Sequence, residues 1–256
     1  MRLTRLATAL LLCAGSIAAS AAPITLTGTV RDFAADGANF EGPIIGLHSG
    51  LVGSTLAGPS PTLTAFGSTL ISSAGAGGFP LWYTKASDSM PLSLTLTEKV
   101  GSPGIYEFTD TTFFPIDGML LNTGVPGTNF HFTYAIAATF DYAPGTGQVF
   151  SFTGDDDVWV YFDKMLGIDL GGVHGAASAT VDLDTLFGPG KAAGTYSFDF
   201  FFAERHTSAS TLHIETSLVL APPPPPGVPE PGGFALAATA LAALAWSQRR
   251  RLPGQR

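Results

Sequence analysis

The chain has 256 residues, of which 45% are hydrophobic, and a formal net charge of −8. Half of its basic residues gather at the two ends, so residues 22–221 carry six Lys and Arg against nineteen Asp and Glu, a formal charge of −13. Such a surface repels nucleic acid and anionic lipid, whereas it favours divalent cations and neutral ligands. About two hundred residues remain between the ends, enough for one well-buried core.

The N-terminus has the three parts of an export signal. Arg2 and Arg5 are followed by the apolar run Leu6–Leu12 and by the small residues Ala19–Ala21. This order predicts a signal peptide over residues 1–21, cleaved after Ala21. The residue before Cys13 is too bulky for a lipoprotein signal, so the mature chain is expected to lack cysteine and to fold without disulfides.

Residues 22–220 show the pattern of an all-β domain. Short runs in which apolar and polar residues alternate are separated by Gly, Pro and Asn, which predicts an antiparallel β-sandwich or barrel. Examples are Leu92–Thr97, Phe130–Tyr134 and Thr195–Phe200. Most of the alternating aromatic residues in the last run are expected in the core. The segment Ser49–Gly78 is poor in charge and rich in Gly, Ser and Pro, so we expect a long surface loop or a ligand-side insertion.

Three consecutive carboxylates, Asp155, Asp156 and Asp157, precede the strongly β-prone run Val158–Phe162. Like charges this close raise one another's pKa and destabilise the folded state. A hard cation removes that cost, because Ca²⁺ is bound by six to eight oxygens from carboxylates and carbonyls. The alternative is a solvated acidic turn that caps a strand.

A hairpin is predicted to follow the carboxylates. Asp163-Lys164 is expected to form its turn, so that the returning run Met165–Leu170 brings Asp169 toward the acidic end of the partner strand. Carbonyls of the Gly171–Gly175 loop could then support a bound cation. Cysteine is absent from the mature chain and no His residues are paired in spacing, so zinc is a poor alternative to Ca²⁺.

The C-terminus has the order of parts of a sorting tail. A Pro-rich linker over 221–227 precedes Pro229-Glu230-Pro231, the apolar run Phe234–Trp246 and Arg249–Arg251. The run is shorter than the ~20 residues that span a bilayer, and the arginines are expected to stay on the cytoplasmic side. An ordinary tail anchor is the alternative.

Residues 228–256 resemble the PEP-CTERM sorting signal of exopolysaccharide-producing Gram-negative bacteria. The resemblance implies cleavage by an exosortase-type membrane protease and transient inner-membrane contact through an apolar C-terminal helix. It also implies an exported protein that is located extracellularly or at the cell surface.

Several motifs of residues 27–218 resemble the fibro-slime domain, in the expected order. They are Thr29–Phe33, Asn39–Glu41, Phe113–Gly118, Asn129–Thr133, Gly154–Val160, Asp169–His174 and Phe201–His206. Two departures are Gly37-Ala38-Asn39 in place of His-Pro-Asp and Asp163-Lys164 in place of Asn-Gly. The first departure leaves the role of the opening motif open, whereas the second changes only a turn.

The fibro-slime domain is in turn similar to the protective-antigen-type, jelly-roll β-barrel of adhesins, lectins and glycosidases. In the lectin members an Asp-Asp pair joined by a cis peptide holds a Ca²⁺ ion that coordinates sugar hydroxyls. The resemblance therefore implies Ca²⁺ on Asp155 and Asp156, with support from Asp157 or Asp169.

Further ligand contacts are predicted near this motif. The candidates are Trp82, Trp159, His174, Glu204 and Arg205. Trp82, Trp159 and the neighbouring Tyr83 could stack on a sugar or lie in the core. His174 could bind a ligand or be a hydrogen-bonded loop residue, and Glu204 with Arg205 could instead form a structural ion pair at a strand end.

Three classes of function are considered, and the first two differ in the role of the bound Ca²⁺. The first is an exported Ca²⁺-dependent carbohydrate-binding or adhesive module associated with exopolysaccharide or a surface glycan. The second is a structural matrix protein whose Ca²⁺ only rigidifies the fold. A hydrolase is disfavoured, because the chain has no Gly-x-Ser-x-Gly, no His-Glu-x-x-His and no clear catalytic carboxylate pair, so we expect no enzyme.

Overall fold

The computed structural model describes residues 21–42, 45–122 and 126–223. Contacts divide the chain into two units, Met1–Pro222 and Pro223–Arg256, and the β domain belongs to the first. The predicted signal peptide and sorting tail lie outside the described residues. None of the helices in the described part of the chain has the length and apolar character needed to cross a membrane.

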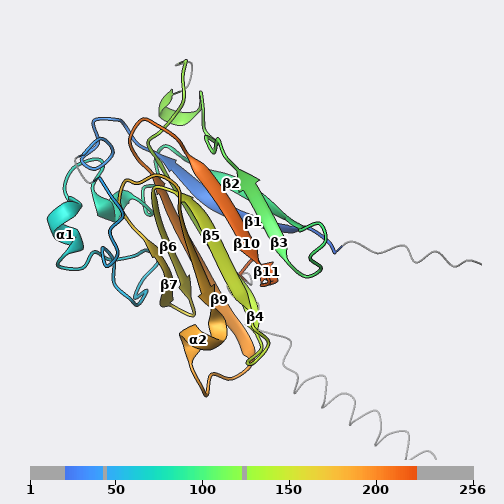
Figure 1. Cartoon of the computed structure of the whole chain (residues 1–256). Coiled ribbons are helices and arrows are strands. Elements are labelled where there is room, and N and C mark those ends of the chain that lie inside the picture. Colours follow the sequence, from blue (N-terminus) through green and yellow to red (C-terminus); the bar gives the residue numbers. More distant parts are fainter. Residues whose placement is uncertain (1–20, 43–44, 123–125, 224–256) are drawn as a thin grey trace, which may run out of the picture. The chain divides into compact units, whose positions relative to one another are not determined.

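The described domain is all-β with a few short helices (Figure 1). The strands are β1 Ile24–Asp32, β2 Ser89–Glu98, β3 Tyr106–Asp110, β4 Phe132–Tyr142, β5 Val149–Asp155, β6 Asp157–Phe162, β7 Met165–Leu170, β8 Ala177–Asp182, β9 Gly194–Glu204, β10 Thr211–Thr216 and β11 Leu220–Ala221. The helices are α1 Gly67–Leu70 and α2 Leu183–Phe187, and the 3₁₀ turns are η1 Phe79–Leu81 and η2 Leu120–Asn122.

The strands form an antiparallel sheet that almost closes on itself. Their order is β7-β6-β9-β4-β1-β2-β3-β10-β5-β8, and β11 pairs with β4. Strand β2 pairs with β1 along most of its length and with β3 at its end, which joins the two halves of the sheet. The outermost strands β7 and β8 contact each other. The prediction of an antiparallel sandwich or barrel is therefore confirmed.

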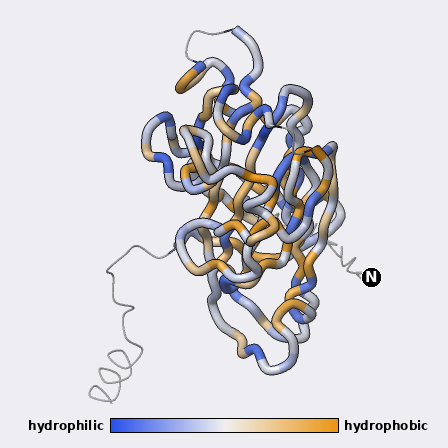
Figure 2. The backbone as a smooth tube through the Cα atoms, turned by 90° about the vertical axis from the view of Figure 1, so that its left-hand side faces the viewer, coloured by the Kyte–Doolittle hydropathy of each residue, from blue (hydrophilic) through white to orange (hydrophobic). Residues whose placement is uncertain are grey.

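The main core lies inside the folded sheet, because side chains alternate between the faces of each strand. Hydrophobic and hydrophilic residues accordingly alternate in short segments along the tube of Figure 2. On β9, Phe198, Phe200 and Phe202 point into this core, and Tyr196 packs against it. The expectation that these aromatic residues are core residues is confirmed.

A second core covers the outer face of β6 and β9. Trp159, Tyr161, Phe201 and Ala203 point to this side, where the long β1–β2 connection supplies the other buried apolar residues. From that connection come Phe33, Phe40, Leu51, Val52, Leu56, Ile71, Phe79, Trp82 and Tyr83. Burying a large apolar side chain contributes about 1.5–3 kcal/mol. Ser49–Gly78 is mostly exposed, as its composition indicates, but Leu51, Val52, Leu56 and Ile71 anchor it on the sheet.

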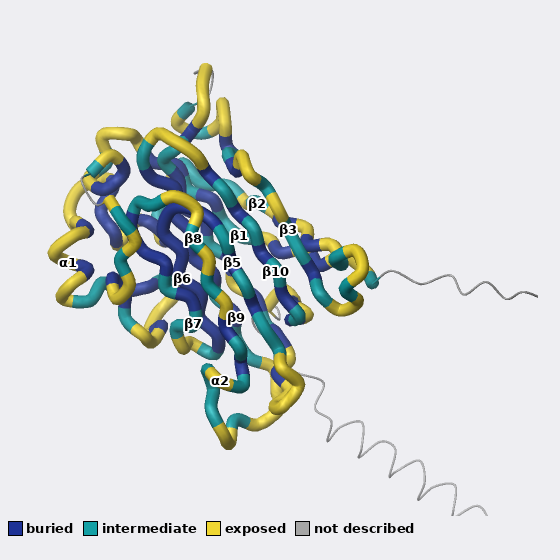
Figure 3. Tube along the Cα trace, viewed as in Figure 1, coloured by how far each residue is buried: buried dark blue, intermediate teal, exposed yellow. Residues whose placement is uncertain are grey.

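Backbone hydrogen bonds fasten this connection to the β6–β7 hairpin. Leu56 N donates to Lys164 O at 2.9 Å, and Leu166 N donates to Ser54 O at 3.0 Å. Figure 3 shows β6 as a buried strand, and each of its residues is buried. Strand β6 is thus buried on both faces.

The predicted hairpin turn at Asp163-Lys164 is confirmed. Its two residues have φ of 47° and 65°, the left-handed pair that a two-residue type I′ turn requires. We expect Lys164→Gly to raise the free energy of unfolding by about 0.5–1 kcal/mol, because glycine adopts this conformation without the steric cost. Urea denaturation measures the change. Ala192→Gly, outside this turn, is the control and should lose stability; a loss for Lys164→Gly as well would contradict the explanation.

Candidate functional site

The acidic triplet lies where the chain crosses from one half of the sheet to the other. Asp155 ends β5, which pairs with β8 and β10, whereas Asp157 begins β6, which pairs with β7 and β9. The Asp155–Asp156 peptide bond is cis. The three side chains are almost completely buried, with relative exposures of 5%, 4% and 0%. A solvated strand cap would leave these carboxylates in water, which is not what the structure shows.

Asp155 and Asp156 accept backbone hydrogen bonds from segments far apart in the sequence. Asp155 Oδ1 accepts from Thr211 N at 2.5 Å. Asp156 accepts from His174 N at 2.9 Å and from Arg205 N at 3.1 Å. The triplet therefore joins the start of β10, the loop after β7 and the end of β9.

Asp157 is neutralised by a buried guanidinium. Its Oδ2 accepts from Arg205 Nε at 2.7 Å and lies 2.6 Å from Nη2, and its Oδ1 accepts from Gly172 N at 2.6 Å. Arg205 also donates to Asn39 O at 3.2 Å, and its Cζ lies 5.2 Å from the Trp82 ring centroid. Arg205 thus fastens the β1–β2 connection to the acidic triplet.

Glu204 is a second buried acid in this region, and it does not pair with Arg205. Adjacent residues of a strand face opposite sides, so Arg205 reaches Asp157 while Glu204 faces the other way. The predicted Glu204–Arg205 ion pair is therefore wrong. Glu204 has no exposed surface, and within the described residues neither of its carboxylate oxygens has a hydrogen-bond partner of good geometry.

Burial shifts the pKa values of these acids upward. Burial, and next to it the charge of Asp157, raises the pKa of Asp156 to about 8. Burial, and next to it the charge of Asp156, raises the pKa of Glu204 to about 10, although the nearby Ser210 hydroxyl lowers it in part. Burial also raises the pKa of Asp155 and of Asp169. Four buried acids (Asp155–Asp157 and Glu204) thus lie in one region, and of these four only Asp157 contacts the buried Arg205 guanidinium.

Asp169 lies opposite Trp159 in the β6–β7 ladder, as the hairpin predicts. Its Oδ1 accepts from Trp159 Nε1 at 3.1 Å, and its Oδ2 accepts from Gly50 N at 2.7 Å. Its charge contributes to the shifted pKa of Tyr161, which is raised above the ordinary range chiefly by burial. Asp169 therefore holds the β1–β2 connection and the indole in place.

The loop after β7 presents amides to the acidic triplet. The carbonyls of Gly171 and Val173 instead accept from His48 N at 2.6 Å and from Gly46 N at 2.7 Å. The loop is thus held between the carboxylates and the β1–β2 connection. Two of the loop carbonyls that were expected to support a bound cation, Gly171 O and Val173 O, are thus turned toward that connection.

The remaining predicted contacts differ in accessibility. Trp82 and Trp159 have no exposed surface and stack on each other at 6.4 Å between ring centroids, so neither indole offers a face to a sugar in this structure. Tyr83 is 5% exposed and belongs to the same core. His174 is half-buried, and its Nδ1 lies 2.8 Å from Gly175 O.

Sequence reasoning missed Asn39, which organises the β1–β2 connection. Its buried amide donates to Ser72 O at 2.9 Å and to Gly77 O at 2.8 Å, and it accepts from Ser72 N at 2.8 Å. The sequence feature that could have pointed to Asn39 is Gly37-Ala38-Asn39, which stands where the fibro-slime motif usually has His-Pro-Asp. Because Asn both donates and accepts, it can bridge two backbone segments as Asp cannot.

Because Glu204 and Asp156 have raised pKa values, the stability of the protein in excess chelator is expected to depend on pH. Their folded pKa values exceed the unfolded values near 4, so the folded state binds more protons and stability falls as pH rises from about 4 toward 8–10. The fall is at most about 1.4 kcal/mol per pH unit for each group. Glu204→Gln, which stays neutral, should flatten the decline in urea midpoint between pH 5 and pH 9. A decline equal to that of the wild type would show that Glu204 is not the titrating acid.

Comparison with known proteins finds relatives of which this chain covers only a part. No family model matches the chain. It is 40% identical over 196 residues to the protein psiQ of Dictyostelium discoideum, covering 70% of this chain and 19% of psiQ. It is 46% identical over 154 residues to psiC, covering 56% and 29%, and 35% identical over 236 residues to psiE, covering 81% and 46%, both from the same organism.

Two solved structures show a weaker likeness. A PA14 sugar-binding domain from an RTX adhesin aligns with a TM-score of 0.29 and 13% identity, over 46% of this chain and 72% of that one. The PA14 domain of the MpAFP antifreeze protein aligns with a TM-score of 0.33 and 8% identity, over 84% and 100%. These TM-scores are too low to assign a shared fold. The chain is thus similar in sequence to psi proteins and spans between a fifth and a half of the length of the three named above.

Proposed function

We propose that this protein is an exported adhesive module that binds carbohydrate with the help of Ca²⁺ held at Asp155 and Asp156. The observation that carries the proposal is the set of four buried acids, of which only Asp157 contacts the buried Arg205 guanidinium. Buried charges are costly unless they are paired or coordinated. A hard cation would offset that cost and keep Asp156 and Glu204 ionised near neutral pH.

The donor chemistry fits calcium. The acids offer only oxygen, the ligand type that Ca²⁺ takes in flexible geometry, and the buried Glu204 carboxylate, which has the Ser210 hydroxyl nearby, adds acceptor capacity in the same region. Across residues 21–42, 45–122 and 126–223, no group of three or more His, Cys, Asp or Glu side chains is arranged to hold a metal ion. Arg205 already pairs with Asp157. Asp155 and Asp156 would be the protein's main ligands, and hydroxyls of a bound sugar would complete the shell.

The carbohydrate part rests on the resemblance to the fibro-slime domain and the lectins related to it. The strongly acidic surface agrees with it, because a charge of −13 over residues 22–221 favours neutral ligands over anionic ones. Export and cleavage by an exosortase-type protease rest on the two terminal signals. An exopolysaccharide or surface glycan of the producing bacterium is the expected partner.

A structural role for Ca²⁺ without glycan binding is the second candidate. The near-complete burial of Asp155 and Asp156 favours it, because a cation held there would have little access to a ligand. In that case Ca²⁺ would stabilise the junction of β5, β6 and β9 and no sugar would bind.

A binding experiment separates the two candidates. The purified full-length protein is applied to exopolysaccharide from the producing bacterium, in CaCl₂ and in EDTA. We expect retention only with Ca²⁺, its loss in Asp156→Asn, and no change in Asp36→Asn, an exposed carboxylate. Stabilisation by Ca²⁺ without Ca²⁺-dependent retention on any glycan would favour the structural role and overturn the adhesive one.

A further inference from the structure

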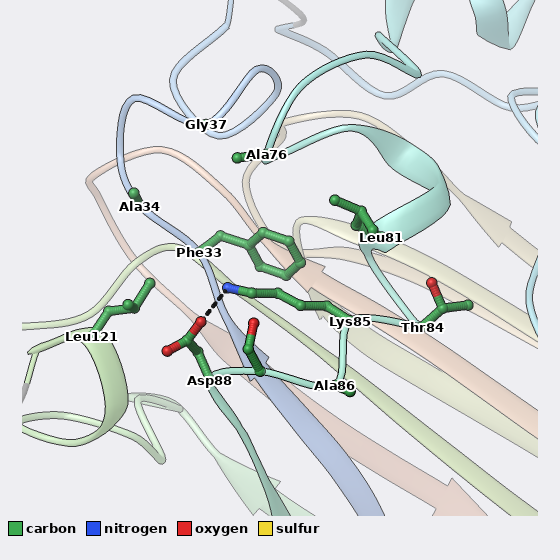
Figure 4. A pocket seen from close by; sticks show the side chains of 11 residues that line it. Phe33, Ala34, Gly37, Ala76, Leu81, Thr84, Lys85, Ala86, Asp88 and Leu121 are labelled. Atoms are coloured by element: carbon green, nitrogen blue, oxygen red, sulfur yellow. Dashed lines mark ion pairs between the residues drawn. The ribbon is translucent and has the colours of Figure 1, made fainter.

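A separate cavity of about 540 Å³ lies where β1 leads into the β1–β2 connection (Figure 4). Phe33, Leu81 and Leu121 provide an apolar lining, and Lys85 and Asp88 lie on one wall. Its volume is in the range of small-molecule sites, which combine apolar walls with a few placed polar groups. It shares no residue with the acidic triplet or with Glu204.

The polar wall of the cavity is one ion pair with spare hydrogen-bonding capacity. Lys85 Nζ lies 3.0 Å from Asp88 Oδ2 and donates to Asp32 O at 2.7 Å. A lysine ammonium has three donors, so one direction remains for a ligand. The pair also holds the pKa of Asp88 below its ordinary value, so that its carboxylate stays ionised and accepts hydrogen bonds.

The geometry of this wall is fixed before any ligand arrives. Lys85 Nζ lies 4.8 Å above the Phe33 ring, and Arg31 Nε donates to Lys85 O at 3.0 Å. Asp88 has a φ of 49°, a left-handed conformation uncommon for a residue other than glycine. Its carbonyl accepts from Asp32 N at 2.9 Å. Strained residues that are held in place from several sides occur preferentially at ligand-binding sites.

We propose that this cavity binds a neutral pyranose residue without the help of Ca²⁺. The ring's C–H face would lie against Leu81, Leu121 and the edge of Phe33. Two adjacent hydroxyls would span the ion pair, one accepting from Lys85 and the other donating to Asp88. An anionic sugar is disfavoured, because Asp88 already neutralises Lys85 and the surrounding domain is strongly acidic.

A second cavity of about 500 Å³ shares Phe33, Ala34 and Leu121 with the first. Asn122 and His131 add polar groups to its lining. A second, linked residue of an oligosaccharide would extend into this cavity.

NMR titration of the full-length protein tests the proposal, with methyl β-D-glucopyranoside, methyl α-L-rhamnopyranoside and their disaccharides as probes. All titrations contain excess EDTA. We expect at least one probe to bind and Asp88→Asn to weaken its binding at least tenfold, because a hydrogen bond to a charged group contributes about 1.5–3 kcal/mol. Asn tolerates the positive φ, so the fold should persist. Leu121→Ser, a half-exposed position, should weaken binding several-fold.

Asp110→Asn on β3 is the matched control and should bind as the wild type does. Absence of binding by every probe in EDTA, or unchanged binding in Asp88→Asn, would overturn the proposal. Loss of Ca²⁺-dependent retention on exopolysaccharide would instead count against the acidic site alone. The two sites are therefore tested independently.

Discussion

Replacing Asp157 with alanine is expected to lower the free energy of unfolding by about 3–5 kcal/mol. The substitution leaves the Arg205 guanidinium, only 1% exposed, without its carboxylate partner. It also leaves Gly172 N without the acceptor that lies 2.6 Å away. An uncompensated buried charge costs far more than a lost surface contact, so we expect the largest loss of any single substitution considered for this protein.

Urea denaturation measures this loss, and a surface ion pair provides the control. Glu215 pairs with Lys99 at a partly exposed position, where loss of one partner costs about 0–1 kcal/mol. Glu215→Ala should therefore change stability little. Equal losses for Asp157→Ala and Glu215→Ala would show that the buried pair has no special role in holding β9 to β6.

Calcium is expected to stabilise the wild-type protein by ~2.7 kcal/mol when its free concentration is a hundredfold above Kd. The reason is linkage: an ion that binds the folded state alone shifts the folding equilibrium toward it. Asp156→Asn keeps the shape of the side chain but removes its charge, so most of this stabilisation should disappear. Binding should also weaken at pH 5, because a proton competes for Asp156, whose pKa is raised to about 8.

Thermal melts in CaCl₂ and in excess chelator measure the effect. Asp36→Asn removes the same charge from the surface and should keep the full calcium response. Mg²⁺ should give a smaller response, because it demands near-ideal octahedral geometry and gives up its waters reluctantly. If the wild type melts at one temperature in CaCl₂ and in chelator, the carboxylates hold no calcium, and the proposed function loses its basis.

Features that depend on near neighbours could be predicted from the sequence. Alternation along Thr195–Phe200 indicated which aromatic residues face the core, because side chains of a strand alternate within two positions. The turn at Asp163-Lys164 was likewise readable from the chain, since turn conformation depends on two residues. Three adjacent carboxylates marked the acidic site for the same reason.

Contacts between residues far apart in the sequence depend on the strand order and could not be predicted from local patterns. Arg205 pairs with Asp157, 48 residues earlier, because β9 lies beside β6 in the sheet, and no local pattern encodes that strand order. From the sequence, Trp82 and Trp159 could either stack on a sugar or lie in the core. In the structure the β1–β2 connection buries them against each other. The same connection forms the cavity at Lys85 and Asp88. The Gly-, Ser- and Pro-rich composition of Ser49–Gly78 indicated a surface segment, but composition does not show which face of the sheet such a segment covers.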